Sequence, residues 1–129
     1  MYKLDNFKSC CDYLGIDNIL PICQIDERQF QAAYKLRVCM KAWNKMDEFK
    51  PDEMASYYQK DVGYTPHFHH KDGRLVSSGN AVNGSAAGIV HAFTDAYTNA
   101  SVGLRLCLKT RERAVEFGKT FIDIFNELI

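Results

Sequence analysis

Apolar residues recur at every third or fourth position in two stretches of the N-terminal half, which is the period of an amphipathic helix. The first stretch covers about 4–14, and Gly15 behind it suits the end of a helix. A connector that contains Pro21 follows the first stretch. We expect its apolar residues to pack over the core: Ile19, Leu20 and Ile22.

The second stretch, at about 26–49, gives the stronger helix signal. Asp26 and Gln29 have the form of a capping box at its start. Pro51 ends the pattern, because the residue before a proline is biased away from helix. One side of this helix is apolar and is expected to face the core: Phe30, Ala33, Leu36, Met40, Trp43 and Met46.

The middle of the chain is rich in aromatic and β-branched residues and predicts a β-hairpin. Its strands are expected near 64–69 and 74–78, on either side of the tight-turn signal Asp72-Gly73. Pro66 has no backbone N–H, so the first strand should lie at a sheet edge or use a non-bonded position there.

Residues 77–101 are rich in Ser, Gly, Ala and Asn, and we expect a long loop there, with room for a strand near 88–94. Strict alternation then predicts a half-buried strand over 101–109. Its apolar face consists of Val102, Leu104, Leu106 and Leu108. Its other face consists of Gly103, Arg105, Cys107 and Lys109.

A C-terminal helix is predicted at about 111–128, with Thr110 as its N-cap. Gly118 lies on its apolar side, where a small residue allows the close approach of a strand or another helix. The apolar stripe consists of Ala114, Phe117, Phe121, Phe125 and Leu128.

Together these elements predict a single α+β domain over residues 1–129. The two N-terminal helices precede a small antiparallel sheet, made of the hairpin at about 64–78 and the strand 101–109. The C-terminal helix packs on that sheet. A chain of this length buries most of the surface that its unfolded form exposes, so it folds without metal or disulfide staples.

The overall charge of the chain gives little indication of a binding partner. Lys and Arg together number 16, as do Asp and Glu, so the net charge is zero and no global field steers the protein toward nucleic acid or an anionic membrane. The cysteine count is odd and no CxxC pair occurs, so we interpret all five as free, mostly buried thiols of a reducing compartment. They are Cys10, Cys11, Cys23, Cys39 and Cys107.

The C-terminal run SVGLRLCLKT (101–110) leads toward EFGKTF (116–121), and shorter motifs precede it: a first helix with a Leu-Gly-Ile step at 7–17, AYKL at 33–36, Lys-Pro-Asp at 50–52 and Tyr-Thr-Pro at 64–66. On these motifs the sequence resembles a family of small uncharacterised proteins that is common in phages, prophages and mobile elements of gut Bacteroidetes. The resemblance covers nearly the whole chain and is most specific over 101–125.

The resemblance implies a phage-type accessory protein in the cytoplasm of a bacterial host cell, and it brings no catalytic residues or cofactor with it. The sequence agrees with that location, because it lacks the apolar run of a signal peptide and the ~20 apolar residues of a membrane span. Relatives tend to carry Trp and Tyr after the Tyr-x-Pro turn, whereas this chain carries His67, Phe68, His69 and His70.

His67 and His69 would lie on one face of a strand, close enough to share a metal ion, and Asp72 or His91 could supply a third ligand. The competing interpretation is a partly exposed sheet face on which histidine rings replace the aromatic rings of relatives. We favour this second interpretation, because three ligands in tetrahedral arrangement are not evident.

The C-terminal unit 101–119 is locally basic. Arg105 and Lys109 would project from one strand face, with Arg111 at the start of the next helix. With Tyr64 and Phe68 on a neighbouring strand, they could stack and pair a nucleotide or single-stranded nucleic acid. The competing interpretation is a solvated face, which the zero net charge favours.

No motif of nucleophilic or acid–base catalysis appears, so the first hypothesis is a non-enzymatic module without a cofactor. It would bind a host or phage protein or a second copy of itself, and no membrane. The alternative is a small nucleic-acid- or nucleotide-binding module that uses 101–119. A third hypothesis, a metal-dependent enzyme, depends on the histidine cluster.

Overall fold

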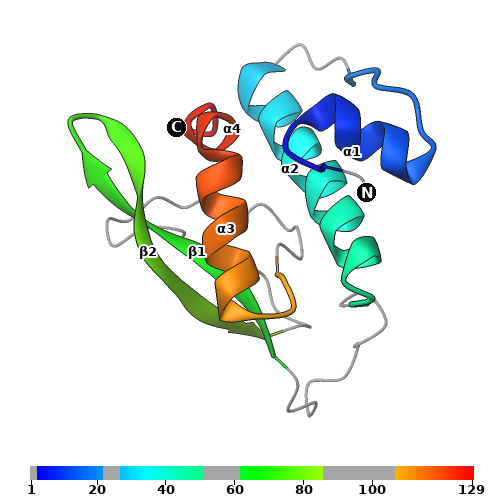
Figure 1. The fold of residues 1–129 in the computed structure, drawn as a ribbon. Helices are drawn as coiled ribbons and strands as arrows, with labels where there is room; N and C mark the ends of the chain where they lie inside the picture. Colours follow the sequence, from blue (N-terminus) through cyan, green and yellow to red (C-terminus); the bar gives the residue numbers. More distant parts are fainter. Residues whose placement is uncertain (1–2, 22–26, 51–61, 86–106) are drawn as a thin grey trace.

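The computed structural model describes residues 3–21, 27–50, 62–85 and 107–129, and every structural statement below refers to these parts of the chain. They form α1 (Phe7–Leu14), α2 (Glu27–Met46), β1 (Val62–Lys71), β2 (Arg74–Ser85), α3 (Arg111–Thr120) and α4 (Ile122–Asn126). α3 and α4 lie across one face of the β1–β2 hairpin, α2 packs on them from the other side, and α1 packs on α2 (Figure 1). The expected α+β architecture, with the C-terminal helix on the sheet, is confirmed.

α1 begins at Phe7 rather than near residue 4, because Asn6 caps it. The Asn6 side chain accepts a hydrogen bond from the Ser9 N–H at 2.7 Å, and the Asn6 N–H donates to Ser9 Oγ. Leu4 stays outside the helix, and its carbonyl accepts from the Trp43 indole N–H at 2.8 Å. Gly15 ends the helix at φ 71°, as predicted.

The predicted apolar side of α2 is buried at its centre, half-buried at Met46 and exposed at its start. Leu36, Met40 and Trp43 lie in the core, whereas Phe30 is 48% exposed, so its predicted burial is wrong. The predicted cap at Asp26 lies outside the described residues. The Gln29 side chain donates to the Leu128 carbonyl at 3.0 Å.

α2 ends at Met46, well before Pro51, so the proline is not what ends the helix. Glu48 adopts the left-handed conformation at φ 55°, and the Phe49 N–H donates back to the Asn44 carbonyl at 2.8 Å. This bond pattern is a Schellman motif, which normally places glycine at the left-handed position.

The predicted hairpin turn is confirmed: Asp72 and Gly73 have φ 53° and 76°, the pair of positive values that a type I′ turn requires. The predicted loop is wrong over 77–85, because β2 continues to Ser85. The remainder of that loop and the strand near 88–94 lie outside the described residues.

A bulge lies inside the hairpin. His67 pairs with Asn80 and Phe68 pairs with Ser77, so two β2 residues, Ser78 and Gly79, lie between consecutive pairs. Gly79 has φ 72°. The extra residues shift the register, which explains why β2 shows no continuous alternation in the sequence.

The predicted strand at 101–109 is described only from Cys107. Leu108 and Tyr64 exchange two backbone hydrogen bonds of 2.8 and 2.9 Å in an antiparallel bridge. The N–H and the carbonyl of Tyr64 therefore point away from β2 and toward Leu108. Pro66 lies two residues later, so its backbone nitrogen also faces away from β2. Since proline has no N–H to donate, this position costs no hydrogen bond to β2, in agreement with the predicted non-bonded position.

The core is centred on aromatic rings between α2, α3 and the sheet. Trp43 meets Phe117 and Phe121 edge to face, with ring centroids 5.1 and 5.7 Å apart. Phe125 is buried as well, and so is Ala114, so the predicted C-terminal stripe is confirmed at these positions.

The C-terminal helix has one break, at Phe121, which separates α3 from α4. Thr110 caps α3 as predicted, accepting from the Arg113 N–H at 3.1 Å. The close approach at Gly118 is also confirmed: a Cβ there would lie 2.6 Å from Pro66 Cβ. Within the described segments, no helix combines the length and apolar character needed to cross a bilayer.

Candidate functional site

The surface predicted around the C-terminal unit is partly assembled. Tyr64 is half-buried on β1, and the Arg111 guanidinium lies over its ring, 5.4 Å from the centroid. Two segments far apart in sequence therefore meet as expected. Arg105 lies outside the described residues, so its predicted role is untested.

Arg111 is used within the protein itself. Its Nη1 donates to Asn80 Oδ1 at 2.9 Å and to the Ala81 carbonyl at 2.7 Å. These bonds tie the first residue of α3 to β2, just beyond the bulge. The guanidinium thus offsets its unfavourable place at a helix N-terminus with two acceptors and an aromatic ring.

Lys109 and Arg113 tie the same unit to the end of α2. Lys109 Nζ donates to the Asp47 carbonyl at 3.1 Å. Arg113 Nε donates to Asp47 Oδ2 at 2.7 Å, its Nη1 donates to Glu116 at 3.0 Å, and its guanidinium lies 4.1 Å from the Trp43 ring centroid. The sequence did not single out Arg113 for this role, because its main partners are about seventy residues away.

Phe68 does not belong to a stacking surface. Its side chain is fully buried and packs on Phe125, with ring centroids 4.7 Å apart. The strand alternation correctly placed Tyr64 and Phe68 on one face, but α3 covers that face at Phe68. The proposed base-stacking role of Phe68 is therefore wrong.

His67 and His69 do share a strand face, with ring centroids 5.4 Å apart. His67 Nδ1 lies 2.9 Å from Ser78 Oγ, and that hydroxyl donates to the His67 carbonyl at 2.8 Å while accepting from the Asn80 N–H. The histidine thus helps to hold the bulge. Among the described residues no three potential ligands form a metal-binding group, and His91 lies outside them.

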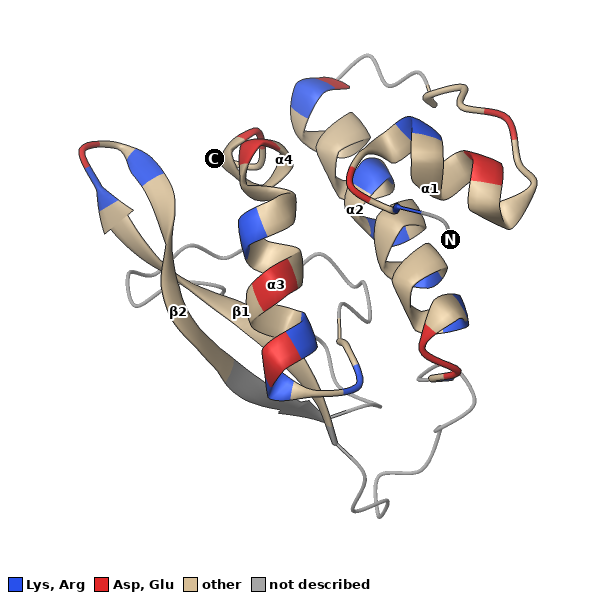
Figure 2. Ribbon diagram, viewed as in Figure 1, with Lys and Arg blue, Asp and Glu red and all other residues tan. Residues whose placement is uncertain are grey.

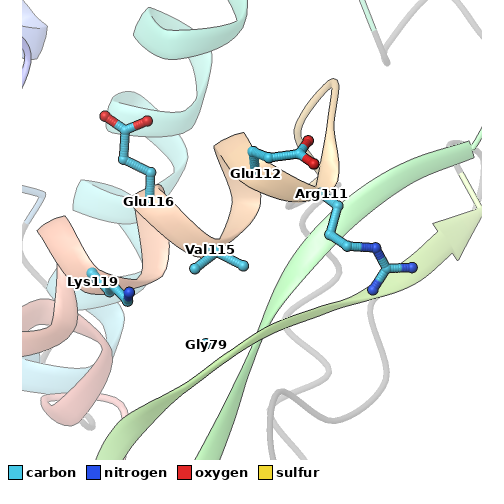
Figure 3. Close-up of a pocket in the computed structure, with 6 residues that line it drawn as sticks. All are labelled: Gly79, Arg111, Glu112, Val115, Glu116 and Lys119. Carbon is cyan, nitrogen blue, oxygen red and sulfur yellow. The ribbon is translucent and has the colours of Figure 1, made fainter.

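An open groove of about 420 Å³ runs between α3 and the bulge of β2 (Figure 3). It is lined by Gly79, Arg111, Glu112, Val115, Glu116 and Lys119. Two basic and two acidic residues line it, and Figure 2 shows the two signs alternating along α3. The groove therefore has no net positive charge with which to attract a phosphate.

Large apolar side chains are exposed at a different end of the molecule. Ile19 is 71% exposed and Phe30 is 48% exposed, and Ile16 is exposed as well. The connector that carries the two isoleucines touches α2, because Gln31 Nε2 donates to the Pro21 carbonyl at 3.2 Å. We give the name connector surface to these three exposed apolar residues, Ile16 and Ile19 on the connector and Phe30 in the first turn of α2. The prediction that Ile19 packs over the core is wrong, and Ile22 lies outside the described residues.

Four cysteines are described, and all four are buried and outside any disulfide, as predicted: Cys10, Cys11, Cys39 and Cys107. Cys107 lies against Gly63 of β1, where an added Cβ would collide with its Cβ and Sγ. The fifth, Cys23, lies outside the described residues.

Comparison of the chain with protein-family models gives no match, and searches among curated proteins and solved structures give none either. The resemblance to the phage and prophage family therefore stays a prediction.

Proposed function

We propose that this protein is a non-enzymatic protein-binding module of a phage or prophage, which associates through the connector surface with a second copy of itself or with a host or phage protein. The observation that carries the proposal is the exposure of Ile19 and Phe30. Burying an isoleucine or phenylalanine side chain against a partner is worth roughly 1.5–3 kcal/mol, so covering both would contribute substantially to an association energy.

The contacts of the basic residues favour protein binding over nucleic-acid binding. Lys109, Arg111 and Arg113 each donate to acceptors within the protein, and two of the three also lie over aromatic rings. Their charges stabilise the junctions between α2, α3 and β2. The connector surface has no comparable internal use among the described contacts, which favours an external partner.

The alternative, nucleic-acid binding by 101–119, has weaker support. Phe68 is buried, and the Arg111 guanidinium is already engaged. Fluorescence anisotropy with single-stranded DNA and RNA at low salt tests it directly. Two results together would favour this alternative. The logarithm of the binding constant would fall linearly with the logarithm of the salt concentration, and Lys109→Glu would abolish binding.

Sedimentation velocity over a wide concentration range tests self-association, and photo-crosslinking in cells tests binding to another protein. The variant Ile19→Ser/Phe30→Ser removes the two most exposed of the three apolar side chains of the connector surface. Val76→Ser is the matched control, because Val76 is also an exposed apolar side chain but lies on β2.

The proposal predicts that Ile19→Ser/Phe30→Ser weakens association at least tenfold with little change in thermal stability, while Val76→Ser leaves association intact. A chain that is strictly monomeric and gives no discrete crosslinked product contradicts it. Equal loss of association in both variants also contradicts it, because that result would place the interface elsewhere.

A further inference from the structure

Three buried cysteines gather where α1 packs on α2. Cys10 and Cys11 belong to α1, Cys39 belongs to α2, and all three are 0% exposed. The pKa of Cys10 and the pKa of Cys39 each respond to the thiol of the other, so the two side chains lie next to each other across this helix–helix contact. A buried cysteine usually packs as a small apolar residue, so a direct thiol–thiol contact is a distinct arrangement.

The contact makes the two thiols unequal. The hydrogen bond from Cys39 lowers the pKa of Cys10 against the opposing effect of burial, and the same bond together with burial raises the pKa of Cys39. Burial also raises the pKa of Cys11. Cys10 belongs to the short helix α1, whose opening would expose its thiol first, so we take Cys10 as the sulfur that attacks the oxidant and Cys39 as the sulfur that reacts with it next.

We propose that Cys10 and Cys39 are an oxidation site, at which hydrogen peroxide forms a disulfide that links α1 covalently to α2. The Cys10 thiolate attacks one peroxide oxygen, the O–O bond breaks, and the departing hydroxide takes up a proton to become water. Cys39 sulfur then attacks the Cys10 sulfenic acid, the S–O bond breaks, and hydroxide leaves with the Cys39 proton as a second water. The two thiols lose two electrons, and the peroxide gains them.

Opening of α1 gives the oxidant access to these buried thiols. α1 has 8 residues and packs mainly on α2, and an isolated helix of that length is unstable in water. Local opening of such an element requires much less free energy than global unfolding. Loss of the N-cap through Asn6→Ala should therefore accelerate the oxidation several-fold.

The disulfide closes a loop that contains the connector between α1 and α2, including Ile16, Ile19 and Phe30. Cross-linking restricts the unfolded chain, so oxidation should raise Tm by roughly 5–15 °C. Oxidation also fixes both flanks of the connector surface. A change in partner binding on oxidation would rest on the proposed function, whereas the disulfide itself would not.

The test uses the full chain with Cys11→Ala and Cys23→Ala, which leaves Cys10, Cys39 and Cys107. Reduced protein is treated with hydrogen peroxide, digested with trypsin without reductant and analysed by mass spectrometry. The expected product links the peptide that carries Cys10 to the peptide that carries Cys39, with the loss of two hydrogens. The wild-type chain should lose the same pair of thiols and gain the same Tm.

Cys39→Ala is the negative control and should give no internal cross-link. Cys10 and Cys39 that stay reduced while added glutathione is fully oxidised would overturn the proposal. A wild-type Cys10–Cys11 or Cys10–Cys23 bridge in place of the expected one would also overturn it. If the disulfide forms but the binding experiments above find no partner, only the proposed function fails.

Discussion

The junction of α3 with α2 and the hairpin differs from the connector between α1 and α2 in the kind of side chain that it buries. At the junction, charged residues are drawn into the fold: Arg113 bridges Asp47 and Trp43, and Arg111 reaches β2. At the connector, apolar side chains such as Ile19 stay in solvent. The described basic residues near the predicted ligand surface have partners within the fold, and apolar residues that were expected in the core are the candidate surface.

The lesson is that a residue's role follows from its partners rather than from its type. An arginine that already has carboxylate, carbonyl and aromatic partners has little capacity left for a ligand. An exposed phenylalanine gains only when another surface covers it. Four predictions, ordered from the largest effect to the smallest, test this contrast.

Phe117→Ala should have the largest effect. The side chain is fully buried against Trp43, so its removal should cost about 3–5 kcal/mol of the free energy of unfolding. Phe30→Ala, on the exposed side of the contrast, should change it by less than about 0.5 kcal/mol. Urea denaturation measures both values, and equal costs would show that Phe30 belongs to the core.

Gly118→Ala should come next. The new Cβ would lie 2.6 Å from Pro66 Cβ, a ring atom that cannot swing away. The strain should outweigh the better helix propensity of alanine and leave a net loss of about 1–2 kcal/mol. Lys119→Ala, one residue further along α3, serves as the exposed control and should be nearly neutral. A stabilised Gly118→Ala variant would show that α3 does not contact β1 this closely.

Arg113→Met should cost about 1–2 kcal/mol, because it removes a partly buried ion pair and the contact with Trp43. Lys8→Met breaks an exposed ion pair with Asp12 and should cost less than about 0.5 kcal/mol. Thermal unfolding of both variants distinguishes the two environments. If both substitutions changed the stability equally and negligibly, the contacts of Arg113 would not stabilise the fold, and its side chain could bind a ligand instead.

Glu48→Gly should have the smallest effect, and a favourable one. Glu48 ends α2 in the left-handed conformation, which glycine adopts without steric cost. The variant should gain about 0.5–1 kcal/mol, measured by the same denaturation experiment. Glu112→Gly, in the first turn of α3, provides the control and should instead lose stability.

The sequence predicted those parts of the fold whose signals are local. The Asp72-Gly73 turn, the Thr110 cap and the stripe that contains Phe117 depend on neighbouring residues, and all three are confirmed. The extension of β2 was missed because small polar residues and a two-residue bulge conceal the alternation.

Prediction of the site failed where a long-range contact decides the outcome. Periodicity placed Phe68 on one strand face and Phe30 on one helix face, but it could not tell which neighbour covers each of them. α3 covers Phe68, while the side chain of Phe30 stays 48% exposed. Arg113 was missed for the same reason, since Asp47 and Trp43 become its partners only when α2 meets α3.

Photo-crosslinking from position 30 tests the central claim most directly. A photoreactive phenylalanine analogue replaces Phe30 in one chain and Val76 in a second, and both are irradiated in cells that express the protein. The account predicts a discrete crosslinked product from position 30 that Ile19→Ser removes, and no such product from position 76. The absence of a product from position 30, or the same product from both positions, would contradict it.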